Sequence, residues 1–193
     1  KLINYVNNFY SKKINIRFAE QYNLNGLAGA ISAGLNVLNR KELENSTLLI
    51  LLGDIILKDK LNDYSYDFVG YNTVEDWSRW CMVELNKDSE VLRFIDKPNE
   101  KPNTDKNIMG VYNLTNPVLL WECLENVFDM EVKINGEYQI SQALSRYIKH
   151  NSIHGINITN YYDLGELNDL NNTRKNISRY FNSITVTDNN SII

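Results

Sequence analysis

Cysteine is scarce in this chain, whose 193 residues include only Cys81 and Cys123. Two cysteines provide neither a disulfide framework nor the spacing of a metal-binding motif. Long apolar runs are also missing, because no stretch approaches the roughly 20 residues that a membrane-spanning helix requires. No signal peptide is visible at the start of the sequence. These absences predict a cytoplasmic protein without a membrane partner.

An excess of basic charge is missing as well. The chain has 20 Lys and Arg residues against 24 Asp and Glu residues, a net charge of −4 and a pI near 5.3. Proteins that bind a nucleic-acid backbone are usually basic, so we expect no nucleic-acid partner. With 43% hydrophobic and 23% charged residues, the composition is that of an ordinary globular protein, and the length suffices for one domain with a core.

The most apolar run of the sequence, residues 48–52, is followed by Gly53 and Asp54. Its five large aliphatic residues leave no polar face, which is typical of a strand buried on both sides in a parallel α/β sheet. The carboxylate of Asp54 would then lie at the carboxyl edge of the sheet, where open α/β folds bind ligands. Gly53 would allow a ligand to approach the backbone closely. In the alternative interpretation, Asp54 caps a turn or the next helix.

Alternating helix and strand patterns indicate the fold class. Helical spacing occurs in residues 2–9 and 27–38, and strand-like alternation in residues 14–18, an order typical of a crossover in a parallel sheet. Later patterns predict a strand near 66–70, a β-hairpin of 82–85 and 91–95, a loop at 97–107, a strand at 108–113, helices starting at Pro117 and near Ile140, a strand at 154–159 and a helix after Glu166. We therefore expect an α/β fold with a Rossmann-like mixed, mainly parallel sheet, helices on both faces and an inserted antiparallel β-hairpin region.

The front of this sheet is expected to be incomplete. Only one predicted strand precedes residues 48–52, whereas a buried parallel strand needs hydrogen-bonding neighbours along both edges. The chain also begins with Lys1 and not with Met. Both observations indicate a piece of a longer protein.

Seven short motifs follow one another along residues 15–176. They are Gln21 with Asn25-Gly26-Leu27-Ala28-Gly29-Ala30, Leu52-Gly53-Asp54, the segment from Glu75 to Glu84, Phe94-Ile95-Asp96-Lys97-Pro98, Met109-Gly110-Val111-Tyr112, the segment from Gly136 to Ser141, and Tyr162-Asp163-Leu164-Gly165. In this order they resemble the motifs of the sugar-phosphate nucleotidylyltransferase family, of which glucose-1-phosphate thymidylyltransferases are members. The resemblance implies an enzyme that condenses an NTP with a sugar 1-phosphate, or with a similar phosphorylated small molecule, and releases pyrophosphate.

The family's opening motif, a glycine-rich G-x-G-T-R-L loop with a following lysine that holds the triphosphate, has no match here. The resemblance thus implies that residues 1–178 are a partial nucleotidyltransferase domain that lacks this loop and its first strand. Residues 179–193 would be a tail or the start of a further domain. We expect the chain alone to release no pyrophosphate and to aggregate.

The resemblance also implies a metal site. Mg²⁺ is the implied cofactor, and Asp54 and Asp163 are its implied ligands, which would be catalytic together with Lys97. Each aspartate follows a predicted strand, so both would meet at one edge of the sheet. The other interpretation of Asp163 is an N-cap of the helix after Glu166.

The implied sugar-phosphate site consists of Lys97, Glu84, Gly110 and Glu137. Lys97 would meet the phosphate as a point charge, although outside this motif it would be a solvated loop lysine. Glu84 and Glu137 would accept hydrogen bonds from sugar hydroxyls; in the alternative they are surface glutamates, and Glu137 opens the next helix. Gly110 would let the sugar ring pack against the backbone.

The implied nucleotide site consists of Gln21, Gly26 and Gly53, of which Gln21 and Gly26 would read the nucleobase edge and allow its close approach. Three other positions depart from the family pattern, of which Ser141 replaces a threonine. Cys81 stands where the family usually has glycine, beside the sugar, and would crowd the pocket or change the choice of acceptor. Tyr162 replaces a tryptophan. Neither His150 nor His154 is assigned a role.

Residues 178–183 resemble the join to a second domain in capsule-associated relatives. This implies a precursor for a surface polysaccharide or capsule, and it leaves open a fused second domain and a homo-oligomer. Two alternatives to the enzyme remain: a non-catalytic relative that binds nucleotide or sugar phosphate, and a nucleotide-sugar glycosyltransferase. The latter would carry a D-x-D pair, which Asp54-Ile55-Ile56 lacks.

Overall fold

The computed structural model describes residues 1–58, 60–61, 65–165, 170 and 173–177. Contacts between residues divide the chain into two units. The helical unit consists of residues 1–47 and 116–151, and the sheet unit consists of residues 48–115 and the described residues from 152 onward. The predicted functional residues are therefore shared between the two units.

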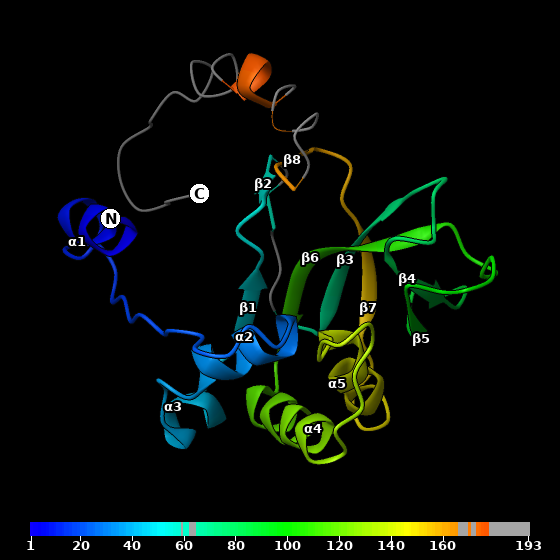
Figure 1. Ribbon diagram of the computed structural model, residues 1–193, viewed down its shortest axis with the longest axis horizontal. Coiled ribbons are helices and arrows are strands. Elements are labelled where there is room, and N and C mark those ends of the chain that lie inside the picture. The colour runs from blue at the N-terminus through cyan, green and yellow to red at the C-terminus, as the bar shows by residue number, and fades with distance from the viewer. Residues whose placement is uncertain (59, 62–64, 166–169, 171–172, 178–193) are drawn as a thin grey trace. The chain divides into compact units, whose positions relative to one another are not determined.

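The helical unit contains α1 (Leu2–Phe9), α2 (Leu27–Leu35), α3 (Arg40–Glu44), α4 (Pro117–Asp129) and α5 (Ile140–Tyr147) (Figure 1). Helix α4 begins where the sequence predicts it, because the Asn116 side chain accepts a hydrogen bond from the backbone N–H of Leu119 (3.0 Å) and Pro117 occupies the first position. The core of this unit is formed by the buried side chains of Leu35, Leu43, Leu120, Leu124, Leu144 and Tyr147.

Two expectations for the helical unit are wrong. Residues 14–18 form no strand. Alternation alone does not make a strand without a neighbour to complete the hydrogen-bond ladder, and Ile14 and Phe18 are 52% and 41% exposed. The second helix ends at Leu35, and the unpredicted α3 follows it. Its start signal was nevertheless present, since Asn39 and Glu42 form a capping box.

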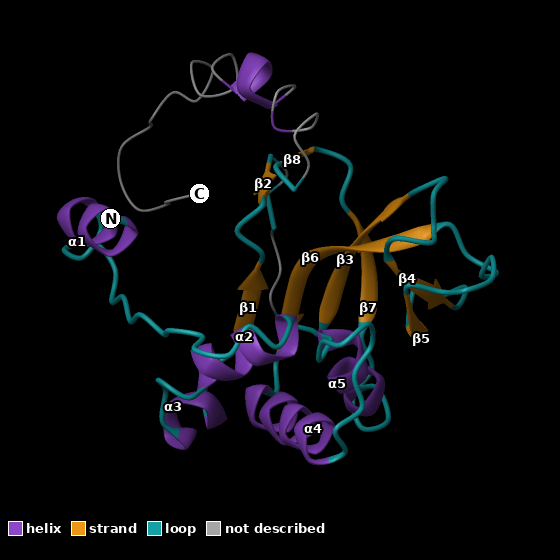
Figure 2. Ribbon diagram, in the orientation of Figure 1, coloured by secondary structure: helices purple, strands orange, loops and turns teal. Residues whose placement is uncertain are grey.

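The sheet unit contains β1 (Leu48–Leu51), β2 (Ile55–Leu57), β3 (Phe68–Thr73), β4 (Cys81–Leu85), β5 (Val91–Asp96), β6 (Lys106–Leu114), β7 (His154–Asn157) and β8 (Tyr161–Asp163). The main sheet has the order β5-β4-β6-β3-β7, and β1 also pairs with β6. Strand β6 pairs with β4 near its start and with β1 near its end. Figure 2 shows these strands in orange.

The mixed α/β fold and the β4–β5 hairpin are confirmed, but the expectation of a mainly parallel sheet is wrong for the described strands. Only β3 and β7 pair in parallel, and the other pairings within the main sheet are antiparallel. The expected burial of residues 48–52 on both faces is also wrong. Strand β1 pairs with β6 alone among the described strands, and Leu49 and Leu51 are 36% and 52% exposed.

A second, two-stranded sheet of β2 and β8 was not predicted, because three residues are too few to show a period. Its pairs join Ile55 with Asp163, Ile56 with Tyr162 and Leu57 with Tyr161. The side chains of Ile55, Leu57 and Tyr161 pack against the core cluster of Phe68, Met109, Val111 and Ile158. One face of this small sheet is therefore anchored to the main sheet, and the alternate residues Ile56 and Tyr162 lie on the other face.

The end of the chain is described only in part. Residues 170 and 173–177 are helical, as expected for the stretch after Glu166, whereas the predicted tail at 179–193 lies outside the described residues. Among the residues that the structure describes, no helix is long and apolar enough to cross a membrane.

Candidate functional site

The two predicted metal ligands lie next to each other in the sheet unit. Asp54 directly precedes β2, Asp163 ends β8, and the backbone N–H of Leu164 donates to the carbonyl of Asp54 (2.8 Å). A Cβ atom built on Gly165 would lie 3.1 Å from Oδ1 of Asp163 and 3.7 Å from Oδ2 of Asp54. A single point therefore lies within reach of both carboxylates. The sequence predicted this meeting, but the β2–β8 pairing produces it, and not the ends of two parallel strands.

These carboxylates suit a magnesium ion that arrives with a phosphate. Asp54 is exposed and Asp163 is half-buried, and the backbone N–H of Gly165 holds Asp163 Oδ1 at 2.7 Å. Among the described residues, no group of three or more His, Cys, Asp or Glu side chains could hold a metal ion. Magnesium needs only one or two protein carboxylates, since phosphate oxygens and water complete its octahedral shell. The metal role of the pair remains a prediction.

Cys81, Asp96 and the buried Tyr112 lie near this pair in the same unit. Cys81 and Asp96 are opposite each other in the β4–β5 ladder. Burial raises the pKa of the Tyr112 hydroxyl, and the charges of Cys81, Asp96 and Asp54 raise it further. Asp96 is thus a further carboxylate whose charge acts on Tyr112, as that of Asp54 does. Asp96 was not predicted as a site residue, although its position directly before Lys97 was a usable signal.

Lys97 has an unusual backbone conformation. Its φ is 44°, in the left-handed region that costs a residue with a Cβ atom roughly 1 kcal/mol or more. Its backbone N–H donates to the carbonyl of Trp80 (3.0 Å), which ties the end of β5 to the loop before β4. Such outliers concentrate at functional sites, so this conformation supports a functional role for Lys97.

Glu84 is engaged by a neighbour in the sheet. Its two carboxylate oxygens accept hydrogen bonds from Nε and from one terminal nitrogen of Arg93, both at 2.7 Å. The two residues are directly opposite in the β4–β5 ladder, and the hydrogen bonds from Arg93 lower the pKa of Glu84. The structure therefore gives Glu84 a structural partner, and its expected contact with a sugar remains a prediction.

The glycines of the sheet unit have different surroundings. A Cβ atom on Gly110, whose φ is +69°, would lie 2.7 Å from the Leu52 side chain. The close packing of Leu52 thus explains this glycine without a sugar. A Cβ atom on Gly53 would meet nothing within 4 Å, so its surroundings are open, as the expected approach of a ligand requires.

Gln21, Gly26 and Glu137 come together in the helical unit. The backbone N–H of Tyr138 donates to Asn25 (2.8 Å), and that of Ala28 donates to the Tyr138 carbonyl (3.1 Å). A Cβ atom on Gly26, whose φ is +105°, would lie 2.5 Å from that carbonyl oxygen. Gln21 Nε2 donates to the Gly26 carbonyl (3.1 Å). Two of the three predicted nucleotide residues, Gln21 and Gly26, and the predicted sugar residue Glu137 are therefore on two segments that are hydrogen-bonded to each other.

A cleft of about 990 Å³ opens beside Gln21. Its lining within the helical unit includes Glu20, Asn25, Ser32 and Phe128, so it offers amide and hydroxyl groups next to an aromatic ring. These are groups that can hydrogen-bond a planar ligand and cover its face. Binding of the nucleobase in this cleft remains a prediction.

The fold and the carboxylate pair define an α/β protein with a candidate site for a metal-bound phosphate. The family model described as nucleotidyl transferase matches residues 2–179, and the chain belongs to this family.

Individual proteins show the same relationship. The chain is 29% identical over 176 residues to the "Bifunctional protein GlmU" of Methanococcus vannielii, and the match covers 82% of this chain and 41% of that protein. The chain thus spans less than half the length of this curated relative. Among solved structures, a UDP-glucose pyrophosphorylase complexed with UDP-glucose has a TM-score of 0.70 at 22% identity, covering 92% of this chain and 73% of the other. A nucleoside-diphosphate-sugar pyrophosphorylase from Vibrio cholerae has a TM-score of 0.66 at 15% identity, covering 78% and 65%. These two likenesses show the fold.

Proposed function

We propose that this chain contributes the carboxylate pair and the acceptor residues to the catalytic site of a nucleotidyltransferase, which joins an NTP to a sugar 1-phosphate, or to a similar phosphorylated small molecule, and releases pyrophosphate. The observation that carries the proposal is the meeting of the Asp54 and Asp163 carboxylates beside Gly165. Membership of the nucleotidyl transferase family supports it, as does the similarity to the GlmU protein.

In this reaction, an oxygen of the acceptor phosphate attacks the α-phosphorus of the NTP. A new phosphorus–oxygen bond forms while the bond to the bridging oxygen of the β-phosphate breaks, and pyrophosphate leaves with that electron pair. Both reactants are polyanions, so alignment and neutralisation of charge are the main tasks of the protein. Magnesium bound at Asp54 and Asp163 would neutralise phosphate charge there.

The other residues hold the two substrates in this proposal. Lys97, whose backbone directly after β5 is left-handed, opposes the negative charge of the acceptor phosphate. Gln21 and Gly26 accept the nucleobase, and Glu137 accepts hydrogen bonds from the acceptor. The nucleobase and the acceptor are not specified by these contacts. A surface polysaccharide or capsule precursor is the product that we propose from the resemblance of residues 178–183, which lie outside the described part of the chain.

The experiment is pyrophosphate release by the complete gene product, with NTPs and sugar 1-phosphates as substrate pairs. Asp54→Asn and Asp163→Asn keep the shape of the side chain and remove its charge, so each should lower turnover by roughly 100-fold or more. Asp88→Asn, at the exposed turn of the β4–β5 hairpin, is the matched control and should leave turnover unchanged. Full activity in either of the first two variants would contradict the proposal and favour the non-catalytic alternative.

A further inference from the structure

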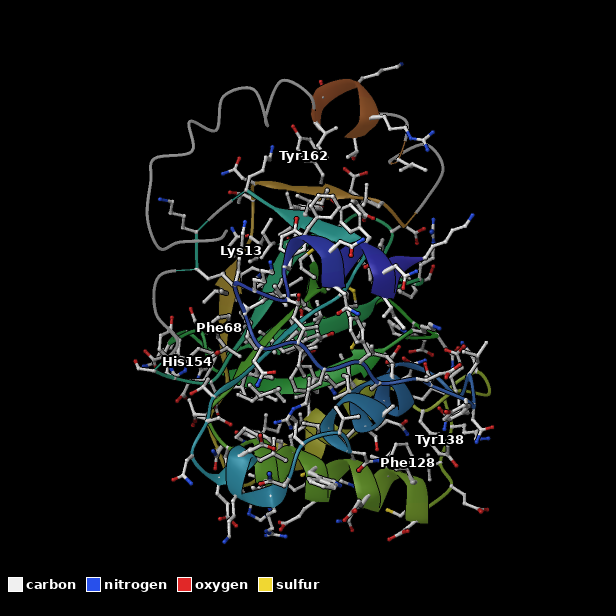
Figure 3. All side chains as sticks on the ribbon, turned by 90° about the vertical axis from the view of Figure 1, so that its left-hand side faces the viewer. Lys13, Phe68, Phe128, Tyr138, His154 and Tyr162 are labelled. Carbon is white, nitrogen blue, oxygen red and sulfur yellow. The ribbon has the colours of Figure 1, made fainter. Side chains whose placement is uncertain are left out.

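Asn25 lines the same cleft of the helical unit as Gln21. Its backbone is anchored, because its carbonyl accepts the N–H of Tyr138 (2.8 Å) and the next residue, Gly26, is the N-cap of α2. Phe128 also lines the cleft, and its ring meets the Tyr138 ring edge to face with the centroids 5.1 Å apart (Figure 3). The Asn25 side chain therefore leaves a fixed backbone in a cleft that has an aromatic wall.

One backbone carbonyl determines the orientation of two side-chain amides. The carbonyl oxygen of Gly26 can only accept a hydrogen bond, so the Nε2 atom of Gln21, which lies 3.1 Å away, must be the donor. The same Nε2 atom lies 3.1 Å from Oδ1 of Asn25. Because an amide nitrogen only donates, the oxygen of Asn25 must be the atom on this side. The Nδ2 atom of Asn25 is thus the one that does not face Gln21 Nε2.

Two polar atoms of this pair remain for a ligand. Oε1 of Gln21 accepts no hydrogen bond from the described part of the chain, and Nδ2 of Asn25 donates none to it. Both residues are half-buried and line the cleft. Neighbouring side chains therefore offer one acceptor and one donor. The complementary ligand has an edge on which an N–H group stands next to a carbonyl oxygen or an unprotonated ring nitrogen, and every nucleobase has such an edge.

Gly29 provides the room for this pair of amides. It is buried in α2, and a Cβ atom built on it would lie 1.8 Å from Oδ1 of Asn25 and 3.1 Å from Nε2 of Gln21. Glycine inside a helix is less favourable than alanine, and the close approach of Asn25 accounts for its presence here. At Gly34 of the same helix, a Cβ atom would meet nothing within 4 Å. Helix α2 thus contains one glycine that the amide pair requires and one that it does not.

We propose that Asn25 is a specificity-determining residue of the nucleotide site. Its Nδ2 atom donates to an acceptor on the nucleobase, next to an N–H of the base that Oε1 of Gln21 accepts. This inference rests on the proposed function, in which Gln21 and Gly26 accept the nucleobase. It adds a side-chain donor to that site and gives Gly29 the role of a positioning residue, which acts through Asn25.

Binding of magnesium NTPs to the complete gene product, measured by isothermal titration calorimetry without an acceptor, tests the contact. UTP, TTP, CTP, ATP and GTP are compared with inorganic tripolyphosphate, which has no base. Asn25→Ala should weaken the binding of the NTP that the wild type prefers at least about 5-fold, the usual effect of losing a hydrogen bond. Its affinity for tripolyphosphate should not change. Asn45→Ala, at an exposed position of the same unit, is the matched control.

Asn25→Asp exchanges the donor for an acceptor in a side chain of the same shape. Its carboxylate can still accept from Nε2 of Gln21, so the ligand now meets two acceptors. Guanine is the base that has two N–H groups side by side, at N1 and N2. The affinity for GTP should therefore rise relative to the affinities for the other four NTPs. Tripolyphosphate measures the part of any loss that the added negative charge causes at the phosphates.

Gly29→Ala tests the positioning role without changing either amide. The added Cβ atom should displace Oδ1 of Asn25 and weaken NTP binding about as much as Asn25→Ala does. Added to Asn25→Ala, the same substitution should cause no further loss, because its effect passes through Asn25. Gly34→Ala is the matched control in the same helix and should keep the wild-type affinity.

Several results would overturn the inference: no NTP binding by the wild type, wild-type NTP affinity in Asn25→Ala, an equal loss for tripolyphosphate, no relative gain for GTP in Asn25→Asp, or a further loss when Gly29→Ala is added to Asn25→Ala. The proposed function fails separately. Full turnover in Asp54→Asn or Asp163→Asn contradicts it and leaves the Asn25 contact in a nucleotide-binding protein. Inactive aspartate variants, together with normal NTP binding by Asn25→Ala, remove only the Asn25 contact.

Discussion

Individual residues in this protein adopt left-handed backbone conformations, which cost free energy in any residue that has a Cβ atom. Both Ser89 and Lys97 have positive φ, 64° and 44°. Ser89 lies at the turn of the β4–β5 hairpin, where the left-handed conformation reverses the chain. Lys97 directly follows β5, where its backbone N–H donates to the carbonyl of Trp80. The two residues share a backbone cost, but only Lys97 is proposed to bind a substrate.

This pair yields a test that separates stability from function. Lys97→Gly removes the steric conflict of the left-handed conformation and should stabilise the fold by up to about 1 kcal/mol, while use of the acceptor falls. Ser89→Gly should give a similar gain without loss of activity. Urea unfolding and the KM for the acceptor provide the two measurements. A Lys97→Gly variant with undiminished acceptor use would remove Lys97 from the site.

The Glu84–Arg93 pair makes stability depend on pH. The hydrogen bonds from Arg93 lower the pKa of Glu84 in the folded state. The pair therefore contributes to the free energy of unfolding above the unfolded pKa of Glu84, which is about 4.3. This contribution is lost as the pH falls through the lower pKa of the folded state. Because Arg93 is 61% exposed, this contribution should stay below about 1 kcal/mol. Arg93→Met should be less stable than the wild type at neutral pH, and urea unfolding should show the difference vanishing in acid. An equal difference in acid would assign the effect to packing.

At the scale of elements, local signals predicted the long segments and missed the short ones. Helix α4 was predicted from Asn116 and Pro117, whose capping chemistry is local. The β4–β5 hairpin was likewise predicted from its alternation. Strands β2 and β8 were missed because their pairing joins residues about 100 positions apart. The prediction of a strand at residues 14–18 was wrong for the opposite reason. Their alternation is typical of a strand, but they form no hydrogen-bond ladder with a neighbouring strand.

The same division applies to the candidate site. Asp54 and Asp163 were predicted because they stand in recognisable motifs. Asp96 was not predicted although it directly precedes Lys97, because its place opposite Cys81 depends on the β4–β5 register. The residue that lies opposite another in a ladder of distant segments cannot be read from the sequence alone.

Gly26 provides a prediction at the scale of elements. Its positive φ and the 2.5 Å approach of a built Cβ atom to the Tyr138 carbonyl mean that a side chain there would separate the segment at 21–26 from residues 137–138. Gly26→Ala should therefore destabilise the protein by about 2 to 4 kcal/mol. Gly34→Ala, in α2, where a Cβ atom meets nothing within 4 Å, should be neutral or stabilise by up to about 1 kcal/mol. Thermal unfolding compares the stability of the two variants. Equal stability of Gly26→Ala and Gly34→Ala would show that the two segments can separate without loss of folding free energy.

At the scale of the whole molecule, strand β1 is a point where a second molecule can attach. Among the described strands it pairs with β6 alone, so its other edge presents backbone donors and acceptors. Leu49 and Leu51, 36% and 52% exposed, add apolar surface beside that edge. An exposed apolar edge strand is a template for pairing with another chain.

We therefore expect the 193-residue chain, studied alone, to self-associate as its concentration rises. Leu51→Lys places a charge beside the open edge and should shift the population toward monomer in sedimentation velocity, because a charged side chain on an edge strand opposes edge-to-edge pairing. Val132→Lys adds the same charge at another exposed apolar position, away from any strand, and should leave association unchanged. Equal effects of the two substitutions would mean that net charge, and not the β1 edge, controls association, since repulsion between whole molecules does not depend on where the charge is placed.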